Sequence, residues 1–153
     1  MEGYPISWTE LPHDSAGIYA GTGKYSIEFE LTGNAEEWLL DLGNLCESAR
    51  VYVNGKDVGI VWSLPYTIQI GQHLNPGKNL LEIEVTNLPA NLIRDYDRRG
   101  VNWRIFKDIN FVSVFYKDIR FDNWDISPSG LTGAVTLIPL TRIFNGTGAI
   151  LHQ

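Results

Sequence analysis

The segment VYVNGKDVG at residues 51–59 constrains the fold more than any other part of the chain. Asn54 and Gly55 separate two short apolar runs, and both residue types tolerate the positive φ angles that a two-residue hairpin turn needs. A turn of this kind joins neighbouring antiparallel strands. The chain is therefore predicted to contain an antiparallel sheet with a hairpin centred on these two residues.

Further runs alternate apolar with polar side chains, as strands do when one face is buried and the other is solvated. In the run 24–32, Tyr25, Ile27 and Phe29 share one face, and the intervening positions are Ser or Glu. A Pro76-Gly77 turn precedes a second long strand of the same pattern. The predicted strands are 24–32, 36–43, 48–55, 56–62, 66–71, the run around Leu81, Ile83 and Val85, 109–121 and 131–141.

About seven or eight short strands separated by polar turns predict an all-β fold, and the late irregular connection favours a jelly-roll β-sandwich. The residues after Asn87 lose the alternation, so we expect a long excursion that includes a helical turn at 90–97. The pattern predicts one domain, 1–153, with a core at about 8–141 and the tail RIFNGTGAILHQ outside it. We expect a soluble chain, because it has no apolar run of 18 residues and its first residues do not resemble a leader.

Charge and cysteine content exclude several functional classes. The net charge is −6, and the basic residues form one small cluster of Arg94, Arg98, Arg99 and Arg104, which argues against nucleic acid as a partner. No Cys or His pair has zinc spacing, and Cys46 is predicted to be a buried small hydrophobe. His13, His73 and His152 are far apart and lie in no catalytic motif.

Several segments in a fixed order resemble one known module. AGTGKYSIEFEL, WLLDLGNLCESARVYVNG, VYVNGKDVGIVW and LNPGKNLLEIEVTNL are similar to the sugar-binding, galactose-binding-like jelly roll of family 2 glycoside hydrolases. WSLPY and EVTNLPANLIRD are closer to the C-terminal jelly roll of family 106 α-L-rhamnosidases. The resemblance covers roughly 8–141, and the long stretch from RDYDRRG to SPSGL departs from a simple module, which leaves the parent enzyme open.

The resemblance implies an accessory domain excised from a larger, polysaccharide-degrading glycoside hydrolase of bacteria. In such enzymes the catalytic acids lie in a separate barrel, so this domain is expected to be non-catalytic and to have the catalytic domain as its partner. A periplasmic or extracellular location follows from the same resemblance. It also leaves a structural Ca²⁺ possible, although no calcium-loop spacing occurs, and no other cofactor is expected.

Acidic residues nevertheless offer pairs for glycoside hydrolysis, which needs two carboxylates roughly 5–10 Å apart. Asp95 and Asp97 would point the same way in an extended segment, and Asp118, Asp122 and Asp125 form a second group. Three Arg residues around the first pair favour structural ion pairs over catalysis. A small stand-alone hydrolase or lyase therefore remains the least favoured alternative.

Aromatic residues in loops are the candidates for sugar contact, because C–H faces of sugars stack on exposed rings. Trp38 and Trp8 are predicted to be core residues, and the tail sequon at Asn145 is interpreted as unused. Trp62 with Tyr66 forms either a plug at one end of the sandwich or a sugar contact. The candidate ligand face consists of Trp103 and Trp124 with Asn102, Arg104, Asp122 and Asn123. The same face could instead dock on a catalytic domain, and an autonomous carbohydrate-binding module is the alternative to an accessory domain.

Overall fold

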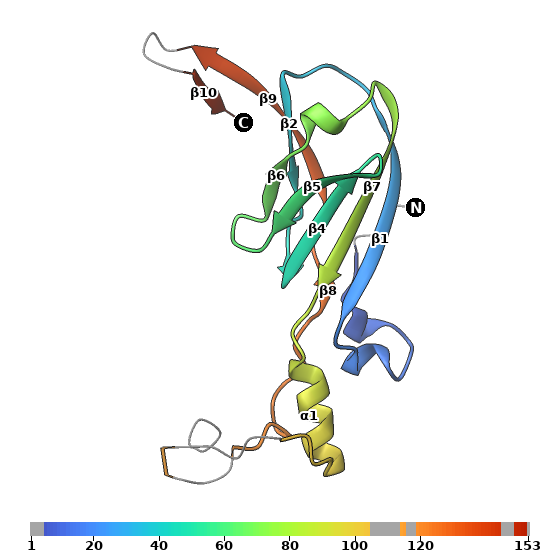
Figure 1. Cartoon of the computed structure of the whole chain (residues 1–153), viewed down its shortest axis with the longest axis vertical. Helices are drawn as coiled ribbons and strands as arrows, with labels where there is room; N and C mark the ends of the chain where they lie inside the picture. The colour runs from blue at the N-terminus through green and yellow to red at the C-terminus, as the bar shows by residue number, and fades with distance from the viewer. Residues whose placement is uncertain (1–4, 105–113, 116–118, 145–148, 153) are drawn as a thin grey trace.

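The computed structural model describes residues 5–104, 114–115, 119–144 and 149–152. It shows a β-sandwich with a helix beyond one end (Figure 1). One sheet has the strand order β1-β7-β4-β5, the other has the order β10-β9-β2-β6, and β3 and β8 form a small third sheet. The strands are β1 (Thr22–Leu31), β2 (Glu37–Asp41), β3 (Leu45–Cys46), β4 (Ser48–Val53), β5 (Lys56–Val61), β6 (Thr67–Gln69), β7 (Gly77–Thr86), β8 (Gly130–Leu131), β9 (Thr136–Phe144) and β10 (Ala149–His152). The helices are α1 (Ala90–Arg99) and the 3₁₀ turns η1 (Trp8–Glu10), η2 (Ala16–Ile18) and η3 (Gly71–His73).

The predicted hairpin is confirmed, because β4 and β5 pair across Asn54 and Gly55, whose φ angles are 53° and 78°. β7 then pairs with β4 on one side and with β1 on the other. Alternation along these strands turns one set of side chains inward, so that Val51, Ile83 and Val85 are fully buried. The first sheet therefore supplies one wall of the core.

The second sheet supplies the other wall through β2 and β9, which pair from Glu37↔Leu140 to Asp41↔Thr136. Leu40 and Ile70 are buried against the first sheet, and Trp38 is half-buried against the same cluster. Trp8 is also buried, and its indole N–H donates to the Tyr25 hydroxyl at 2.6 Å. The predictions of an all-β sandwich and of core positions for both tryptophans are confirmed.

Three predicted segments differ from the structure. The run 131–141 is two strands rather than one, because the backbone at Gly133 passes so close to Asn44 that a Cβ there would lie 2.6 Å from the Asn44 nitrogen. The tail is not outside the fold, since β9 continues to Phe144 and pairs with β10. Most of the predicted strand 109–121 lies outside the described residues, and its described parts, 114–115 and 119–121, are a turn and irregular chain.

The excursion after Asn87 contains a complete helix, α1, where a helical turn was expected. Cys46 is half-buried, and burial together with the nearby Glu47 carboxylate raises the pKa of its thiol. None of the helices in the described residues is both long and apolar enough to cross a bilayer.

The buried wall of the first sheet can be tested by replacing Ile83, which is 0% exposed. Ile83→Ala should lower the free energy of unfolding by about 2–5 kcal/mol, because the lost methylenes leave a cavity between the sheets. Ile60→Ala on β5 is the matched control, since Ile60 is 53% exposed and should cost less than about 1 kcal/mol. Urea unfolding followed by circular dichroism measures both, and equal losses would contradict the assignment of the inner face.

Candidate functional site

Helix α1 begins after Pro89 and ends at Gly100, whose left-handed φ of 68° allows two closing backbone hydrogen bonds. Arg98 and Arg99 lie in its last turn, where their positive charges interact favourably with the negative end of the helix dipole. Below the sandwich, α1 stands beside the chain that returns toward β8 (Figure 1). These segments together carry most of the predicted ligand residues.

Three polar side chains spaced by three residues along α1 hold the returning chain in place, and we call this set the α1 clamp. Asn91 exchanges two hydrogen bonds with the Ser127 backbone, at 2.8 and 2.9 Å. One turn further on, Arg94 donates to the Trp124 carbonyl, and Asp97 accepts from the Phe121 N–H at 2.8 Å. The helix and the segment 121–127 therefore run antiparallel with matching three-residue steps.

Asp97 is the most enclosed member of the α1 clamp, with 6% of its side chain exposed. Its carboxylate also accepts the Trp103 indole N–H at 2.7 Å and pairs with Arg104 at 3.1 Å. Burial by itself raises the pKa of Asp97, but the hydrogen bonds from Phe121 and Trp103 and the positive charge of Arg104 outweigh it. The net result is a pKa below the ordinary value for aspartate.

Stacked rings cover this ion pair. The Arg104 guanidinium lies 4.8 Å from the centre of the Trp103 ring and 5.7 Å from that of Phe121. Phe121 in turn packs edge-on against Trp124, with ring centres 4.4 Å apart. Trp103 and Arg104 are thus half-buried structural members of the cluster, because both their polar groups and part of their faces are already engaged.

The remaining predicted ligand residues on this face lie nearer the solvent. Asn102 and Asn123 are exposed, and Asp122 pairs with Arg120 at 2.7 Å. Trp124 is 46% exposed, Ile126 two residues later is 54% exposed, and Leu88, just before α1, is 57% exposed. We call Trp124 and Ile126 the apolar ridge of this unit.

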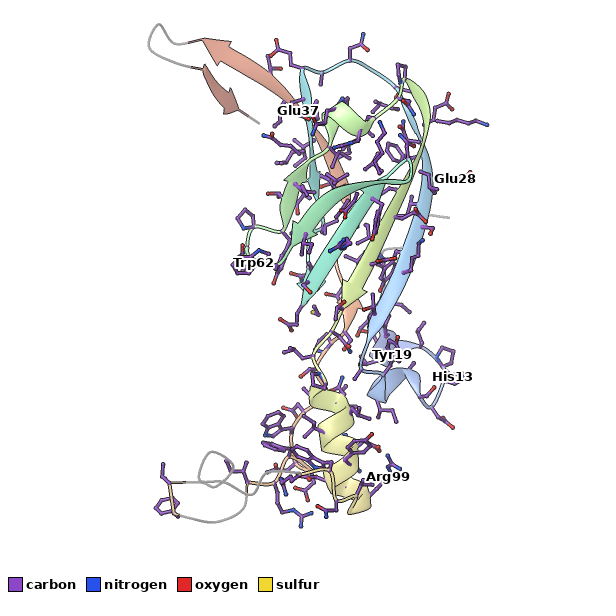
Figure 2. All side chains as sticks on the ribbon, viewed as in Figure 1. His13, Tyr19, Glu28, Glu37, Trp62 and Arg99 are labelled. Atoms are coloured by element: carbon purple, nitrogen blue, oxygen red, sulfur yellow. The ribbon has the colours of Figure 1, made fainter. Side chains whose placement is uncertain are left out.

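The structure separates the environments of Trp62 and Tyr66, the two members of the second predicted site. Trp62 is 73% exposed and lies in the loop between β5 and β6, at the side of the sandwich (Figure 2). Leu64 beside it is 77% exposed, and the Leu64–Pro65 peptide bond is cis. Tyr66 instead packs on the core, and its carbonyl accepts the Leu42 N–H at 2.9 Å. The plug interpretation is therefore wrong for Trp62 and holds only for Tyr66.

Three of the carboxylates singled out for chemistry, Asp95, Asp97 and Asp122, are engaged in pairs, whereas Asp125 is exposed. Asp95 and Asp97 do not lie in extended chain, as their spacing suggested, but on a helix where residues two apart face different directions. Asp95 pairs with Arg99 at 2.6 Å, and Asp97 belongs to the α1 clamp. Asp118 lies outside the described residues, within which no group of three or more potential metal ligands occurs. The structural calcium ion stays a prediction.

Sequence reasoning missed Asn91, Phe121 and Ser127 as members of this site. A signal was available in Asn91, Arg94 and Asp97, because polar residues at steps of three inside a helical segment mark a face that needs polar partners. The partners themselves carry no signal, since all three, Phe121, Trp124 and Ser127, contribute only backbone groups to the clamp.

Comparisons with known proteins relate most of the chain to glycosidases. A family model described as glycosyl hydrolase 2 galactose-binding domain-like matches residues 19–130. A protein of Formosa agariphila assigned as a beta-glucuronidase is 32% identical over 86% of this chain and 13% of that protein. Among solved structures, the rhamnosidase from Novosphingobium sp. PP1Y aligns with a TM-score of 0.70 and 30% identity, over 86% of this chain and 12% of that one.

A beta-glucuronidase from an uncultured Clostridium sp. aligns with a TM-score of 0.51 over 55% of this chain and 16% of that one. Its identity of 22% supports a shared fold alone. The chain therefore spans only about an eighth of the length of the first two relatives.

Asp97 should make the α1 clamp sensitive to acid. Because its pKa is lowered by folding, its ionised form stabilises the clamp above the ordinary aspartate pKa of about 3.9, and this stabilisation should be lost as the pH falls further. The Trp103 indole N–H resonance, assigned with Trp103→Phe, should shift with a midpoint below about 3.9. Asp97→Asn should abolish that shift and lower the stability of the clamp by about 1.5–3 kcal/mol.

Asp95→Asn is the matched control, since it makes the same change on the same helix in an exposed pair with Arg99. It should leave the Trp103 titration in place. An indole resonance that titrates identically in wild type and in Asp97→Asn would contradict the assigned contact.

Proposed function

This chain belongs to the glycosyl hydrolase 2 galactose-binding domain-like family, and from that premise we propose that it is a non-catalytic accessory domain of a polysaccharide-degrading glycoside hydrolase. In this role it packs on the catalytic domain of its parent enzyme, in the periplasm or outside the cell. The match over about an eighth of the length of two glycosidase relatives supports this placement.

The observation that carries the proposal is the apolar ridge of Trp124 and Ile126. These two side chains are 46% and 54% exposed on a unit in which Asp95, Asp97 and Asp122 are paired internally. Exposed apolar side chains of this kind are typical of a protein interface, where tryptophan is enriched. The ridge is therefore the part of this chain best suited to contact a catalytic domain.

The state of the carboxylates supports a non-catalytic role. General acid catalysis by a carboxyl group at neutral pH needs a raised pKa, whereas the pKa of Asp97 is lowered. Asp95 and Asp122 each form an ion pair with an arginine, at 2.6 and 2.7 Å. In these contacts the three acids act as anchors for local structure.

Carbohydrate contact is a second candidate function, favoured by the exposure of Trp62. An indole that is 73% exposed at a loop tip offers a flat apolar face to a sugar ring. Arg50 and Asp57 lie on the neighbouring strands β4 and β5 and pair at 2.8 Å, so hydrogen-bonding groups are present on the same sheet. Trp62 takes precedence over Trp103 here, because Trp103 is engaged by Asp97 and Arg104.

The docking role can be tested by replacing the matching segment of the Novosphingobium rhamnosidase with this chain. In that chimera, Trp124→Ala with Ile126→Ser should lower stability by about 1.5–3 kcal/mol for each side chain buried at the junction. In the isolated chain the same change should cost less, about 0.5–1.5 kcal/mol at Trp124 for its lost contact with Phe121 and less than about 0.5 kcal/mol at Ile126. Thermal unfolding of both proteins measures the difference.

Ile60→Ser is the matched control for the chimera, because Ile60 is similarly exposed but lies on β5, away from the ridge. It should affect the chimera and the isolated chain equally. A ridge variant whose losses are the same in both proteins would refute docking through the ridge.

The sugar contact can be tested on the isolated chain with a panel of pectic and other plant oligosaccharides. Saturation-transfer NMR should detect binding with a dissociation constant of about 1 mM, the weak end of specific association. Trp62→Ala should abolish the signal and Trp124→Ala should leave it unchanged. No transfer to any glycan, or equal loss in both variants, would sink this second candidate without touching the first.

A further inference from the structure

Strand β1 is a long and regular edge of the first sheet. Among the residues that the structure describes it pairs with β7 alone, through ten consecutive residues from Thr22↔Thr86 to Leu31↔Gly77 without a register shift. The opposite edge of the same sheet, β5, is interrupted by a shift beside Val51 and Tyr52. Proteins commonly protect sheet edges with bulges, prolines, inward-pointing charges or charged side chains along the edge, and of these β1 has only the last, at Lys24, Glu28 and Glu30.

The direction of its backbone groups follows from the neighbouring strands. On β7, the N–H and C=O of Leu80 both bond Asn54 on the β4 side, so the odd-numbered residues of β7 face β1. Odd residues of β7 pair with odd residues of β1, which leaves the even residues of β1 pointing outward. Thr22 agrees with this assignment, because its carbonyl accepts the Tyr19 hydroxyl at 3.0 Å.

The free part of the edge therefore runs from Lys24 to Glu30. Within the residues that the structure describes, no hydrogen bond reaches the outward N–H and C=O groups of Lys24, Ser26, Glu28 and Glu30. These four positions are symmetric about Ile27. A strand added at this edge must match the backbone hydrogen-bonding groups of these four residues and must also fit against their side chains.

An apolar cleft opens beside this edge. It has a volume of about 210 Å³ and lies between the two sheets, where Ile27 and Phe29 of β1 face Leu137 of β9. Ile27 is 38% exposed although it occupies an inward-facing position of the alternation. The sandwich is thus incompletely closed along β1, and an added strand would cover apolar side chains as well as backbone groups.

We propose that the occupant of this edge is β1 of a second copy of the chain, paired antiparallel about a two-fold axis at Ile27. In this register Lys24, which also pairs with Glu82 on β7 at 2.6 Å, lies opposite Glu30, and Ser26 lies opposite Glu28, each twice, so Glu30 meets an opposite charge and Glu28 meets a hydroxyl donor. Ile27 lies opposite its own copy at a non-hydrogen-bonded position, where side chains approach most closely. The two four-stranded sheets become one continuous sheet of both copies.

Neighbouring registers fit less well. A two-fold axis at Ser26 needs the outward groups of Thr22, whose carbonyl is already bonded to Tyr19. Axes at Lys24 or Glu28 place like charges directly opposite each other. The axis at Ile27 is the register that uses the four free positions and pairs opposite charges.

The test uses the complete chain in sedimentation equilibrium. The average mass should rise from 17.2 kDa toward twice that value as the protein concentration increases to about 1 mM, the weak end of specific association. Ile27→Lys should abolish the rise, because it places two ammonium groups at the axis, whereas Ile27→Val should retain it. Circular dichroism shows that the variants are folded, which is expected since Ile27 is partly exposed.

Charge exchange then tests the register. Glu30→Lys and Lys24→Glu should each weaken self-association by about tenfold or more, because two opposite-charge pairs become like-charge pairs. An equimolar mixture of the two variants should recover association, since only the mixed dimer restores both pairs. Glu28→Lys, which faces Ser26 in this register, is the matched control with a smaller loss.

A mass that stays at 17.2 kDa up to that concentration would overturn the proposal and leave the edge to a strand of another protein. Dimers that persist in Ile27→Lys would also overturn it, because they would use a different surface. If each charge variant alone associated as strongly as the equimolar mixture, the proposed register would be overturned.

Discussion

The closure of two sheets over one apolar core is the constraint on which the rest of this molecule depends. Val51, Ile83 and Val85 from one wall meet Leu40 and Ile70 from the other, and all are essentially buried. Their burial supplies the main stabilising free energy, at about 25 cal/mol for each Å² of apolar surface removed from water. The inward faces of the strands are used by the core. The surfaces available to partners therefore lie in the connections and at the sheet edges, where the apolar ridge, the Trp62 loop and the edge of β1 are found.

Buried polar side chains then order the connections, which cannot form a core of their own. Asn79 bonds both Asn54 and Asn75 beside the hairpin, and Asn87 bonds Tyr19 and Ser129 at the other end of β7. The α1 clamp repeats this principle outside the sandwich around Asp97. Among the described residues, no buried side-chain nitrogen or oxygen lacks a hydrogen-bond partner. Losing one partner would leave the other desolvated and unpaired, so each such residue fixes two segments at once.

How much of this could be read from the sequence depended on the range of the interactions. The hairpin at Asn54 and Gly55 and the alternation of β1 and β7 are local patterns, and the structure confirms them, just as the family match confirms the galactose-binding-like module. The split of 131–141 was not predictable, because the close approach of Gly133 to Asn44 joins residues far apart in the chain. Trp103 shows the same limit in part: Asp97, which accepts its indole N–H, lies only six residues earlier, but Phe121, which packs against its ring, is distant in the chain.

The distribution of charge distinguishes the two kinds of exposed apolar surface. Around the α1 clamp, Asp95, Asp97 and Asp122 are paired with arginines within the unit, so these three carboxylates need no counter-charge from a partner that covers the ridge. Along β1, Lys24 pairs with Glu82, whereas Glu28 and Glu30 form no ion pair within the described residues and remain available to a neighbouring strand. The surface around the α1 clamp, whose three carboxylates are paired within the unit, fits many apolar partners of suitable shape. An edge with an ordered charge sequence selects its partner and its register, which is why the two surfaces are suited to different partners.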